Sequence, residues 1–209
     1  MVNVATFGCD RSWKRKILTK VPPASTRVLD LACGTGIVTF AIARRYPNCH
    51  VIGVDVTKEY LDVARAKAER ERIKNVEFIH KRAEDAIIDE PFDCVTASYL
   101  PKYADLKTLT RNIKAMLKED GAVVMHDFTY PPNRLVASLW ELYFKLLQTA
   151  GRLIFPKWGI IYDELPLIVR ETTWLPDLVS CLQQNGFHKI MIERLIVGSA
   201  AIVTARNEK

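Results

Sequence analysis

Three features that define common classes of protein are missing from this sequence. Met1–Lys20 contains no long apolar run ahead of a small-residue cleavage site, so we expect no signal peptide and a cytoplasmic protein. The five cysteines are odd in number and include no CxxC pair, which favours reduced core thiols over a disulfide framework or a zinc site. The four histidines show no ligand spacing, and we expect no metal.

The chain also has no internal repeat, low-complexity tract or linker that would divide it. At 209 residues it fits a single domain covering residues 1–209, which is long enough to bury a sizeable core. The net charge of +6 favours an anionic partner, either nucleic acid or a membrane surface, although many soluble enzymes are equally basic.

Strand-like and helix-like segments alternate along most of the chain. Short apolar runs predict five strands, at Arg27–Leu31, His50–Val54, Val76–His80, Cys94–Ser98 and Ala122–Phe128. Helical spacing predicts the helices between them, at Ile37–Arg45, Lys58–Arg72 and Leu106–Leu117. This order argues for right-handed βαβ crossovers and a Rossmann-like α/β fold with a doubly wound, mostly parallel sheet.

The end of the chain departs from this alternation. Pro176–Gln184 is predicted to be a helix, with proline in its first turn and Gly186 just past its end. The apolar runs His188–Arg194 and Ala200–Thr204 follow in close succession, which fits a hairpin and an antiparallel C-terminal strand in a seven-stranded sheet. The aromatic-rich segment 131–171 is predicted to be a helical insertion that covers the active site at the carboxyl edge of the sheet.

The strongest local feature is VLDLACGTG at Val28–Gly36, where the first strand turns into a helix. Gly34 and Gly36 let the backbone approach a ligand without a Cβ in the way. A dinucleotide-binding turn continues to a third glycine, where this chain has Thr39, and Asp30 would repel a pyrophosphate. Asp30 could instead accept a hydrogen bond from the ammonium group of S-adenosylmethionine, which favours that cofactor over NAD. Its alternative role is to cap the loop.

A second carboxylate, Asp55, ends the next strand within VIGVDV at Val51–Val56. A carboxylate at this place can accept from both hydroxyls of a ribose. Its alternative role is to cap the N-terminus of the following helix. Because Asp30 and Asp55 end neighbouring strands around the glycine turn, we predict that both bind the cofactor.

Five successive motifs resemble those of the class I S-adenosylmethionine-dependent methyltransferases. They are VLDLACGTG, VIGVDV, RAED at Arg82–Asp85, FDCVTAS at Phe92–Ser98 and LKEDGAVVMHDF at Leu117–Phe128, and they cover most of the chain in the family's order. The resemblance implies S-adenosylmethionine as the cofactor. It also implies a set of binding residues, namely Asp30, Ala32, Gly34, Gly36, Asp55, Val56, Arg82, Ala83, Glu84 and Ser98.

More narrowly, the chain resembles the ubiquinone/menaquinone C-methyltransferase family. SWKRKIL at Ser12–Leu18 is similar to the helix before that family's first strand, and DFTYPPN at Asp127–Asn133 to its strand-five ending. LVSCLQQNGF and LIVGSAAIVTAR are similar to its closing helix and hairpin. The resemblance implies methylation of a ring carbon of a lipophilic quinol. The chain departs from the family at Lys102, where arginine is usual, and at Arg82, where a small polar residue is usual.

The chemistry of methyl transfer indicates which further residues to look for. Transfer from a sulfonium is an in-line displacement, so the enzyme must align the reactants and exclude water. Deprotonating a ring hydroxyl would make a quinol carbon more nucleophilic, so a base or a cation is expected after strands four and five. The candidate catalytic residues are His126, Asp127, Tyr99 and Lys102. Alternatively, His126 is a satisfied strand-end histidine and Lys102 a solvated loop lysine.

A wide apolar surface marks the helical segment Leu135–Leu147. One narrow polar stripe runs along it, formed by Ser138, Glu141, Lys145 and Gln148. The remaining surface of the helix is apolar and is wider than the single face that a helix usually buries against its domain. It could be a lid over a lipid-like substrate, a homodimer contact, a peripheral contact with the inner face of a membrane, or simple packing on the sheet. The membrane contact is favoured by basic residues near the N-terminus, namely Lys14, Arg15, Lys16 and Lys20.

Three other functions compete with quinol methylation. The first is methylation of a soluble phenol, amine or thiol. The second, nucleic-acid methylation, fits the charge, but Ser98-Tyr99-Leu100-Pro101 stands where amino-group nucleic-acid methylases carry a polar residue, two prolines and an aromatic, so we expect no nucleic-acid partner. The third is a non-catalytic protein that binds S-adenosylmethionine, which the intact glycine turn and ribose carboxylate disfavour.

Overall fold

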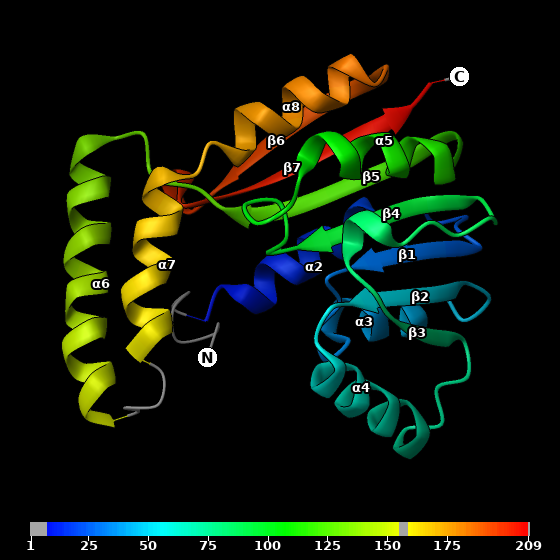
Figure 1. Ribbon diagram of the computed structural model, residues 1–209, viewed down its shortest axis with the longest axis horizontal. Coiled ribbons are helices and arrows are strands. Elements are labelled where there is room, and N and C mark those ends of the chain that lie inside the picture. Colours follow the sequence, from blue (N-terminus) through cyan, green and yellow to red (C-terminus); the bar gives the residue numbers. More distant parts are fainter. Residues whose placement is uncertain (1–7, 155–158, 209) are drawn as a thin grey trace.

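A single seven-stranded sheet forms the centre of the molecule. The computed structural model describes residues 8–154 and 159–208, without the side chains of residues 150–162. The strand order is β3-β2-β1-β4-β5-β7-β6 (Figure 1). The strands are β1 (Arg27–Leu31), β2 (His50–Asp55), β3 (Val76–His80), β4 (Phe92–Ser98), β5 (Leu117–Phe128), β6 (Phe187–Leu195) and β7 (Ala200–Asn207). Among these described strands, β7 alone runs in the direction opposite to the other six, which confirms the predicted sheet.

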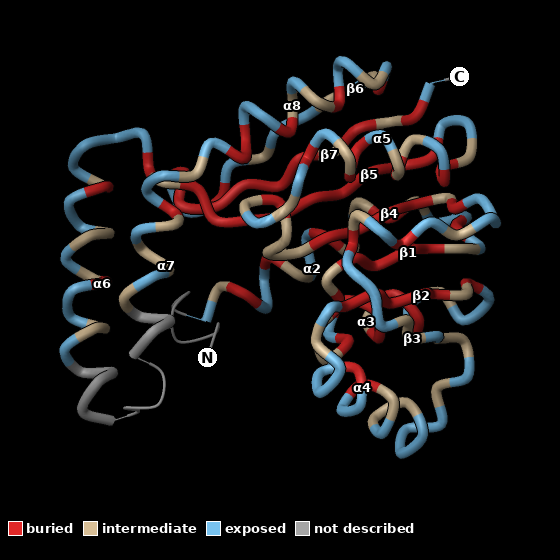
Figure 2. The backbone as a smooth tube through the Cα atoms, in the orientation of Figure 1, coloured by how far each residue is buried: buried red, intermediate tan, exposed pale blue. Residues whose placement is uncertain are grey.

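Helices cover both faces of the sheet. One core cluster packs α2 (Asp10–Lys20) and α3 (Ile37–Arg45) on one face, and a second packs α5 (Leu106–Met116) and α8 (Trp174–Gln184) on the opposite face. The helix α4 (Lys58–Arg70) lies against β2 and β3. Burial is concentrated in the strands and the inner faces of these helices (Figure 2). The chain order reverses between β1 and β4, which is where ligands bind in doubly wound sheets.

Local sequence explains where several elements begin and end. Asp105 caps α5, accepting hydrogen bonds from the backbone N–H groups of Lys107 and Thr108. Pro176 is the third residue of α8, and Gly186 follows that helix with a φ of 70°. The predicted hairpin is present as the antiparallel pair of β6 and β7.

The boundary between α5 and β5 differs from the prediction. β5 begins at Leu117, the residue predicted to end the helix, and β4 begins at Phe92, two residues before the predicted start. Phe92 pairs with Leu117, after which a register shift leads to the pair of Cys94 and Ala122. An irregular pairing of this kind has no constant period, so apolar alternation does not reveal it.

Two helices stand apart from the sheet between β5 and α8. α6 (Arg134–Ile154) and α7 (Gly159–Glu171) lie side by side beyond the carboxyl ends of the parallel strands (Figure 1). In α6, Ala137 and Phe144 are buried. A stripe of large side chains remains exposed, formed by Leu135, Leu139, Leu142 and Leu146. In the part of the chain that the structure describes, no helix is both long and apolar enough to cross a membrane.

Candidate active site

The turn from β1 into α3 has the unusual backbone that its glycines predict. Gly34 and Gly36 have φ values of 56° and 79°, in the left-handed region that favours glycine. A Cβ built on Gly36 would lie 2.7 Å from the ring of Phe40. Both the conformation and the close approach therefore require glycine at position 36.

A cavity of about 340 Å³ opens beside this turn, and we call it the glycine-loop cavity. Asp30, Ala32, Gly34, Asp55 and Ser98 are predicted cofactor-binding residues that line it. Its other lining residues are Lys14, Cys33, Thr35, Ile37, Val38, Tyr60 and Tyr99. The carboxyl ends of β1, β2 and β4 thus bring half of the predicted residues to one place.

Asp30 lies in the cavity wall with its carboxylate almost fully buried. One oxygen accepts a hydrogen bond from the Thr39 hydroxyl at 2.6 Å, and the other accepts one from the Thr96 hydroxyl at 2.7 Å. Burial raises the pKa of Asp30 to about 6, against the opposing effect of these hydrogen bonds. Each carboxylate oxygen has a second lone pair, so Asp30 can still accept from a cationic ligand.

Asp55 joins the glycine turn to the end of β2. One carboxylate oxygen accepts from the backbone N–H of Gly34 at 2.7 Å, and the other accepts from the N–H of Thr57 at 2.8 Å. The second bond lies just ahead of α4, whose N-cap is Thr57, so the alternative that Asp55 caps this helix was wrong. The first fixes the shape of the glycine turn, so Asp55 also shapes the cavity that it lines.

The remaining predicted cofactor residues do not line the glycine-loop cavity. Val56 is exposed beside it, and Gly36 acts through the turn. Arg82 precedes the short helix η1 (Ala83–Asp85), and its side chain is 65% exposed. Glu84 instead accepts from the backbone N–H of Asp105 at 3.1 Å. An adenine contact by Arg82, Ala83 or Glu84 therefore stays a prediction.

Tyr99 is the one candidate catalytic residue that lines this cavity. Its φ of 65° is strained for a non-glycine residue. Its hydroxyl donates to Asp10 at 2.7 Å, and burial raises the pKa of Tyr99 further above its ordinary value. The hydroxyl therefore stays protonated at neutral pH and does not supply a phenolate base, whereas the residue forms part of the cavity wall.

His126 lies one layer behind the cavity wall. It is fully buried, and its Nδ1 forms a hydrogen bond of 3.1 Å with the Ser98 hydroxyl, whereas its Nε2 has no partner among the described residues. Burial lowers the pKa of His126 to about 3, so the ring is neutral at working pH. Ser98, which faces the cavity, is the route by which His126 can act on a ligand.

Lys102 and Asp127 form a buried ion pair. Their side chains are 2% and 0% exposed, and the Lys102 Nζ lies 2.6 Å from an Asp127 oxygen. Burial lowers the pKa of Lys102 and raises that of Asp127, and the attraction between the two charges opposes both shifts. Neither residue lines the glycine-loop cavity. The expectation of a solvated loop lysine at position 102 was therefore wrong.

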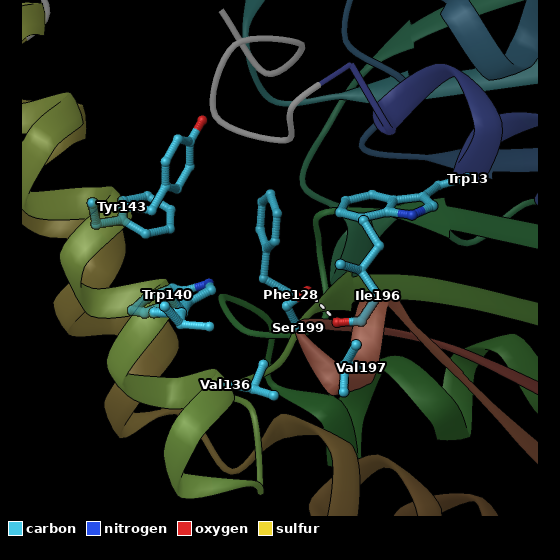
Figure 3. A pocket seen from close by; sticks show the side chains of 10 residues that line it. Trp13, Phe128, Val136, Trp140, Tyr143, Ile196, Val197 and Ser199 are labelled. Atoms are coloured by element: carbon cyan, nitrogen blue, oxygen red, sulfur yellow. Dashed lines mark hydrogen bonds between the residues drawn. The ribbon is translucent and has the colours of Figure 1, made fainter.

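A second cavity, of about 230 Å³, lies between α6 and the sheet, and we call it the α6 cavity. Its walls are largely apolar (Figure 3), formed by Trp13, Phe128, Val136, Leu139, Trp140, Tyr143, Phe144, Ile196, Val197 and Ser199. Phe128 of this wall ends β5, and Ile196, Val197 and Ser199 lie in the connection between β6 and β7. An apolar cavity of this kind suits a hydrophobic ligand.

Four aromatic rings connect the two cavities. This four-ring cluster consists of Trp13, Tyr99, His126 and Phe128, with ring centroids 4.9–5.8 Å apart in the contacting pairs. Tyr99 lines the glycine-loop cavity, whereas Trp13 and Phe128 line the α6 cavity. The Tyr99 and Phe128 rings stack with an interplanar angle of 25°. Ligands in the two cavities would therefore meet at these rings.

The basic residues of α2 do not form the expected open patch. Lys14 pairs with Asp10 at 2.9 Å and lines the glycine-loop cavity. Lys16 and Lys20 both pair with Glu193 of β6. Asp10 and Glu193 thus offset part of the charge of these three lysines, while Arg15 is exposed, so the group adds less attraction to an anionic surface than the sequence suggested.

Sequence reasoning missed three residues that shape the site. Thr39 and Thr96 hold both oxygens of Asp30, and Lys14 faces the cavity from a helix that precedes β1. Thr39 carried a signal, because it occupies the place of the third glycine in a dinucleotide-binding turn. Lys14 lies in SWKRKIL and Thr96 in FDCVTAS, but neither motif indicated that these two side chains reach the site.

The chain matches known methyltransferases along almost its whole length. The family model described as "ubiE/COQ5 methyltransferase family" matches residues 1–207. The chain is 30% identical to a demethylmenaquinone methyltransferase of Lactobacillus johnsonii, covering 97% of this chain and 84% of that protein. It is also 30% identical to the ubiquinone/menaquinone biosynthesis C-methyltransferase UbiE of Geotalea daltonii, covering 96% and 87%.

The fold is also found among solved structures. The YcgJ protein of Bacillus subtilis superposes with a TM-score of 0.66 at 20% sequence identity, covering 96% of this chain and 99% of that chain. At this identity the likeness concerns the fold alone.

Proposed function

The chain belongs to the ubiE/COQ5 methyltransferase family, and from this premise we propose that it methylates a ring carbon of a quinol that is a menaquinone or ubiquinone precursor. The observation that carries the proposal is the pair of cavities that meet at the four-ring cluster. One is lined by carboxylates and a lysine, and the other is apolar. A polar methyl donor and a lipophilic acceptor require this division of one site.

S-adenosylmethionine fits the residues of the glycine-loop cavity. Asp55 is placed to accept from the ribose hydroxyls, and Asp30 from the ammonium. A pyrophosphate would face both carboxylates, which disfavours NAD. The bound donor supplies an electrophilic methyl group on a sulfonium. The protein's part is to hold that methyl in line with the acceptor carbon and to keep water out.

Ser98 and His126 are proposed to act on the acceptor. If the Ser98 hydroxyl donates to the neutral Nδ1 of His126, its oxygen lone pairs remain free to accept from a ring hydroxyl of the acceptor. A hydrogen bond of this kind increases electron density on the ring and makes its carbon more nucleophilic. With a pKa of about 3, His126 is too weak a base to take the proton itself, so we assign it to the positioning of Ser98.

The α6 cavity is proposed to hold the apolar part of the acceptor, with segment 131–171 as the insertion that covers it. Each buried CH₂ contributes about 0.8 kcal/mol to binding, so a prenyl tail is the feature that such walls select. The acceptor ring would then lie against the four-ring cluster, next to the glycine-loop cavity.

We expect the purified protein to methylate a short-tailed demethylmenaquinol with a kcat/KM about tenfold or more above that for the same ring without its tail. Transfer of label from S-adenosylmethionine measures both rates. Catechol and a simple aromatic amine serve as further acceptors. Equal rates on tailed and tailless rings, or a preference for the amine, would contradict the quinol assignment.

We further propose that the exposed leucines of α6 contact a membrane, from which the acceptor enters. Leu135, Leu139, Leu142 and Leu146 recur at helical spacing on one side of α6, and Leu139 also lines the α6 cavity. The stripe thus runs from open solvent to the cavity wall. An apolar helix face of this kind binds in the interfacial region of a bilayer.

The double substitution Leu142→Ser and Leu146→Ser should weaken sedimentation with lipid vesicles about tenfold or more, because two large apolar side chains are lost from the contact. Salt should have a smaller effect than this double substitution, since Glu193 offsets part of the charge of Lys16 and Lys20. Val63→Ser with Ile192→Ser is the control, because these apolar side chains are also exposed but lie on other elements.

Trp140 and Phe144 are unsuitable for this test. Phe144 is only 4% exposed and packs against the Trp140 ring, so substitution would disturb the helix itself. If wild type ignores vesicles but dimerises through α6, the leucine stripe is a homodimer contact. If it does neither, the helix acts only as a lid.

A further inference from the structure

The helix α2 brings a lysine to the glycine-loop cavity from a segment that precedes the first strand. Lys14 lines the cavity, and its side chain is 14% exposed. Its Nζ lies 2.9 Å from one oxygen of Asp10, whose other oxygen accepts from the Tyr99 hydroxyl at 2.7 Å. The ammonium also lies 5.7 Å from the centre of the Tyr99 ring. These contacts fix the position of the ammonium at the wall of the cavity.

Lys14 supplies the only positive charge among the described residues that line this cavity, opposite the carboxylates of Asp30 and Asp55. Its charge is also a small effect among those that oppose the rise that burial causes in the pKa of Asp30. A lysine ammonium has three N–H donors, of which Asp10 takes one. The remaining donors can bind an anionic group of a ligand.

We propose that Lys14 binds the α-carboxylate of the donor, the anionic group at its amino-acid end. This inference rests on the proposed function, under which the donor carries one ammonium, one carboxylate and one ribose. Asp30 and Asp55 can serve the ammonium and the ribose, and neither can serve a carboxylate. Lys14 completes the set with the charge that the other two lack.

The position of Lys14 gives this contact a second effect. Trp13, the preceding residue of α2, lines the α6 cavity and packs against Phe128. One helical turn therefore contributes to both cavities. A donor carboxylate held by Lys14 fixes the turn that also forms the wall of the acceptor cavity.

Calorimetry with two product analogues tests the assignment. S-adenosylhomocysteine has the carboxylate, and its decarboxylated form keeps the adenosine, the thioether and the ammonium but lacks that group. Wild type should bind S-adenosylhomocysteine about tenfold or more tightly than the decarboxylated compound, because a charge-assisted hydrogen bond is lost with the carboxylate. Lys14→Met should remove this preference by weakening S-adenosylhomocysteine alone. Lys14→Arg should keep much of it.

Lys16→Met is the matched control, since Lys16 lies on the same helix but pairs with Glu193 and does not line the cavity. It should leave both affinities unchanged. Equal weakening of both compounds in Lys14→Met would assign the lysine to the docking of α2 and overturn the inference. Unchanged affinities would overturn it as well. If wild type binds neither compound, the proposed donor is wrong and the assignment of Lys14 falls with it.

Discussion

Replacing Lys102 by Met is expected to lower the free energy of unfolding by about 3–5 kcal/mol, because it leaves the buried carboxylate of Asp127 without its counter-charge. Both side chains are almost inaccessible to water. Asp127 would keep its hydrogen bonds from the backbone N–H groups of Lys102 and Phe128, which do not neutralise it. Urea denaturation of the two proteins at pH 7 measures the loss.

The pH dependence of this loss follows from the direction of the Asp127 shift. Burial raises the pKa of Asp127, and removing Lys102 takes away the main opposing effect. A raised carboxyl pKa means that stability is lost as the pH rises through the folded-state value. The deficit of Lys102→Met relative to wild type should therefore be largest at neutral pH and shrink in acid.

Two further variants make the test specific. Adding Asp127→Asn to Lys102→Met removes the unpaired charge and keeps an acceptor for the backbone, so it should recover most of the stability. Lys58→Met breaks the exposed pair with Asp62 and should leave the unfolding midpoint unchanged. A Lys102→Met protein as stable as wild type at pH 7 would show that the pair contributes nothing to the fold.

Replacing His126 by Phe should lower kcat by up to about a hundredfold while leaving the affinity for S-adenosylhomocysteine unchanged. Phenylalanine can keep the ring contacts with Trp13 and Tyr99 but has no nitrogen for Ser98. Ser98→Ala should cause a similar loss. The double variant should be no slower than either single variant, because both changes remove the same hydrogen bond.

Two pH profiles separate this role from a purely structural one. Because burial lowers the pKa of His126 to about 3, wild-type kcat should show no inflection near pH 6.5. An inflection there that His126→Phe removes would make the histidine a titrating base and contradict the positioning role. In unfolding experiments, a lowered histidine pKa means that stability is lost as the pH falls from about 6.5 toward 3. His126→Phe should be less sensitive to acid over that range.

Much of the fold could be predicted because its elements are locally coded. The helix Ile37–Arg45 and the strands Arg27–Leu31 and Val76–His80 have the predicted bounds, since each combines regular spacing with a clear turn on either side. The predicted start of β5 was wrong because the first residue of this strand pairs with β4 before a register shift. That pairing depends on β4, so no local pattern marks it.

The glycine turn and the carboxylates at the ends of β1 and β2 could likewise be predicted, because parallel strands bring their carboxyl ends to one edge. The roles of Lys14 and Lys102 could not. Lys14 was interpreted as membrane-facing, and Lys102 as a candidate catalytic residue or, alternatively, a solvated loop lysine. The structure places one at the wall of the cavity and the other in a buried ion pair.

The sequence by itself determined the order of the elements, the glycine turn and the methyltransferase family, because periodicity and turn chemistry act between residues close in the chain. Only the tertiary structure decided which polar side chains face a ligand and which face one another. Asp10 meets Tyr99, and Ser98 meets His126, through contacts that join distant segments. Burial then sets the charge of such groups, because removal from water penalises every ion that the fold does not pair.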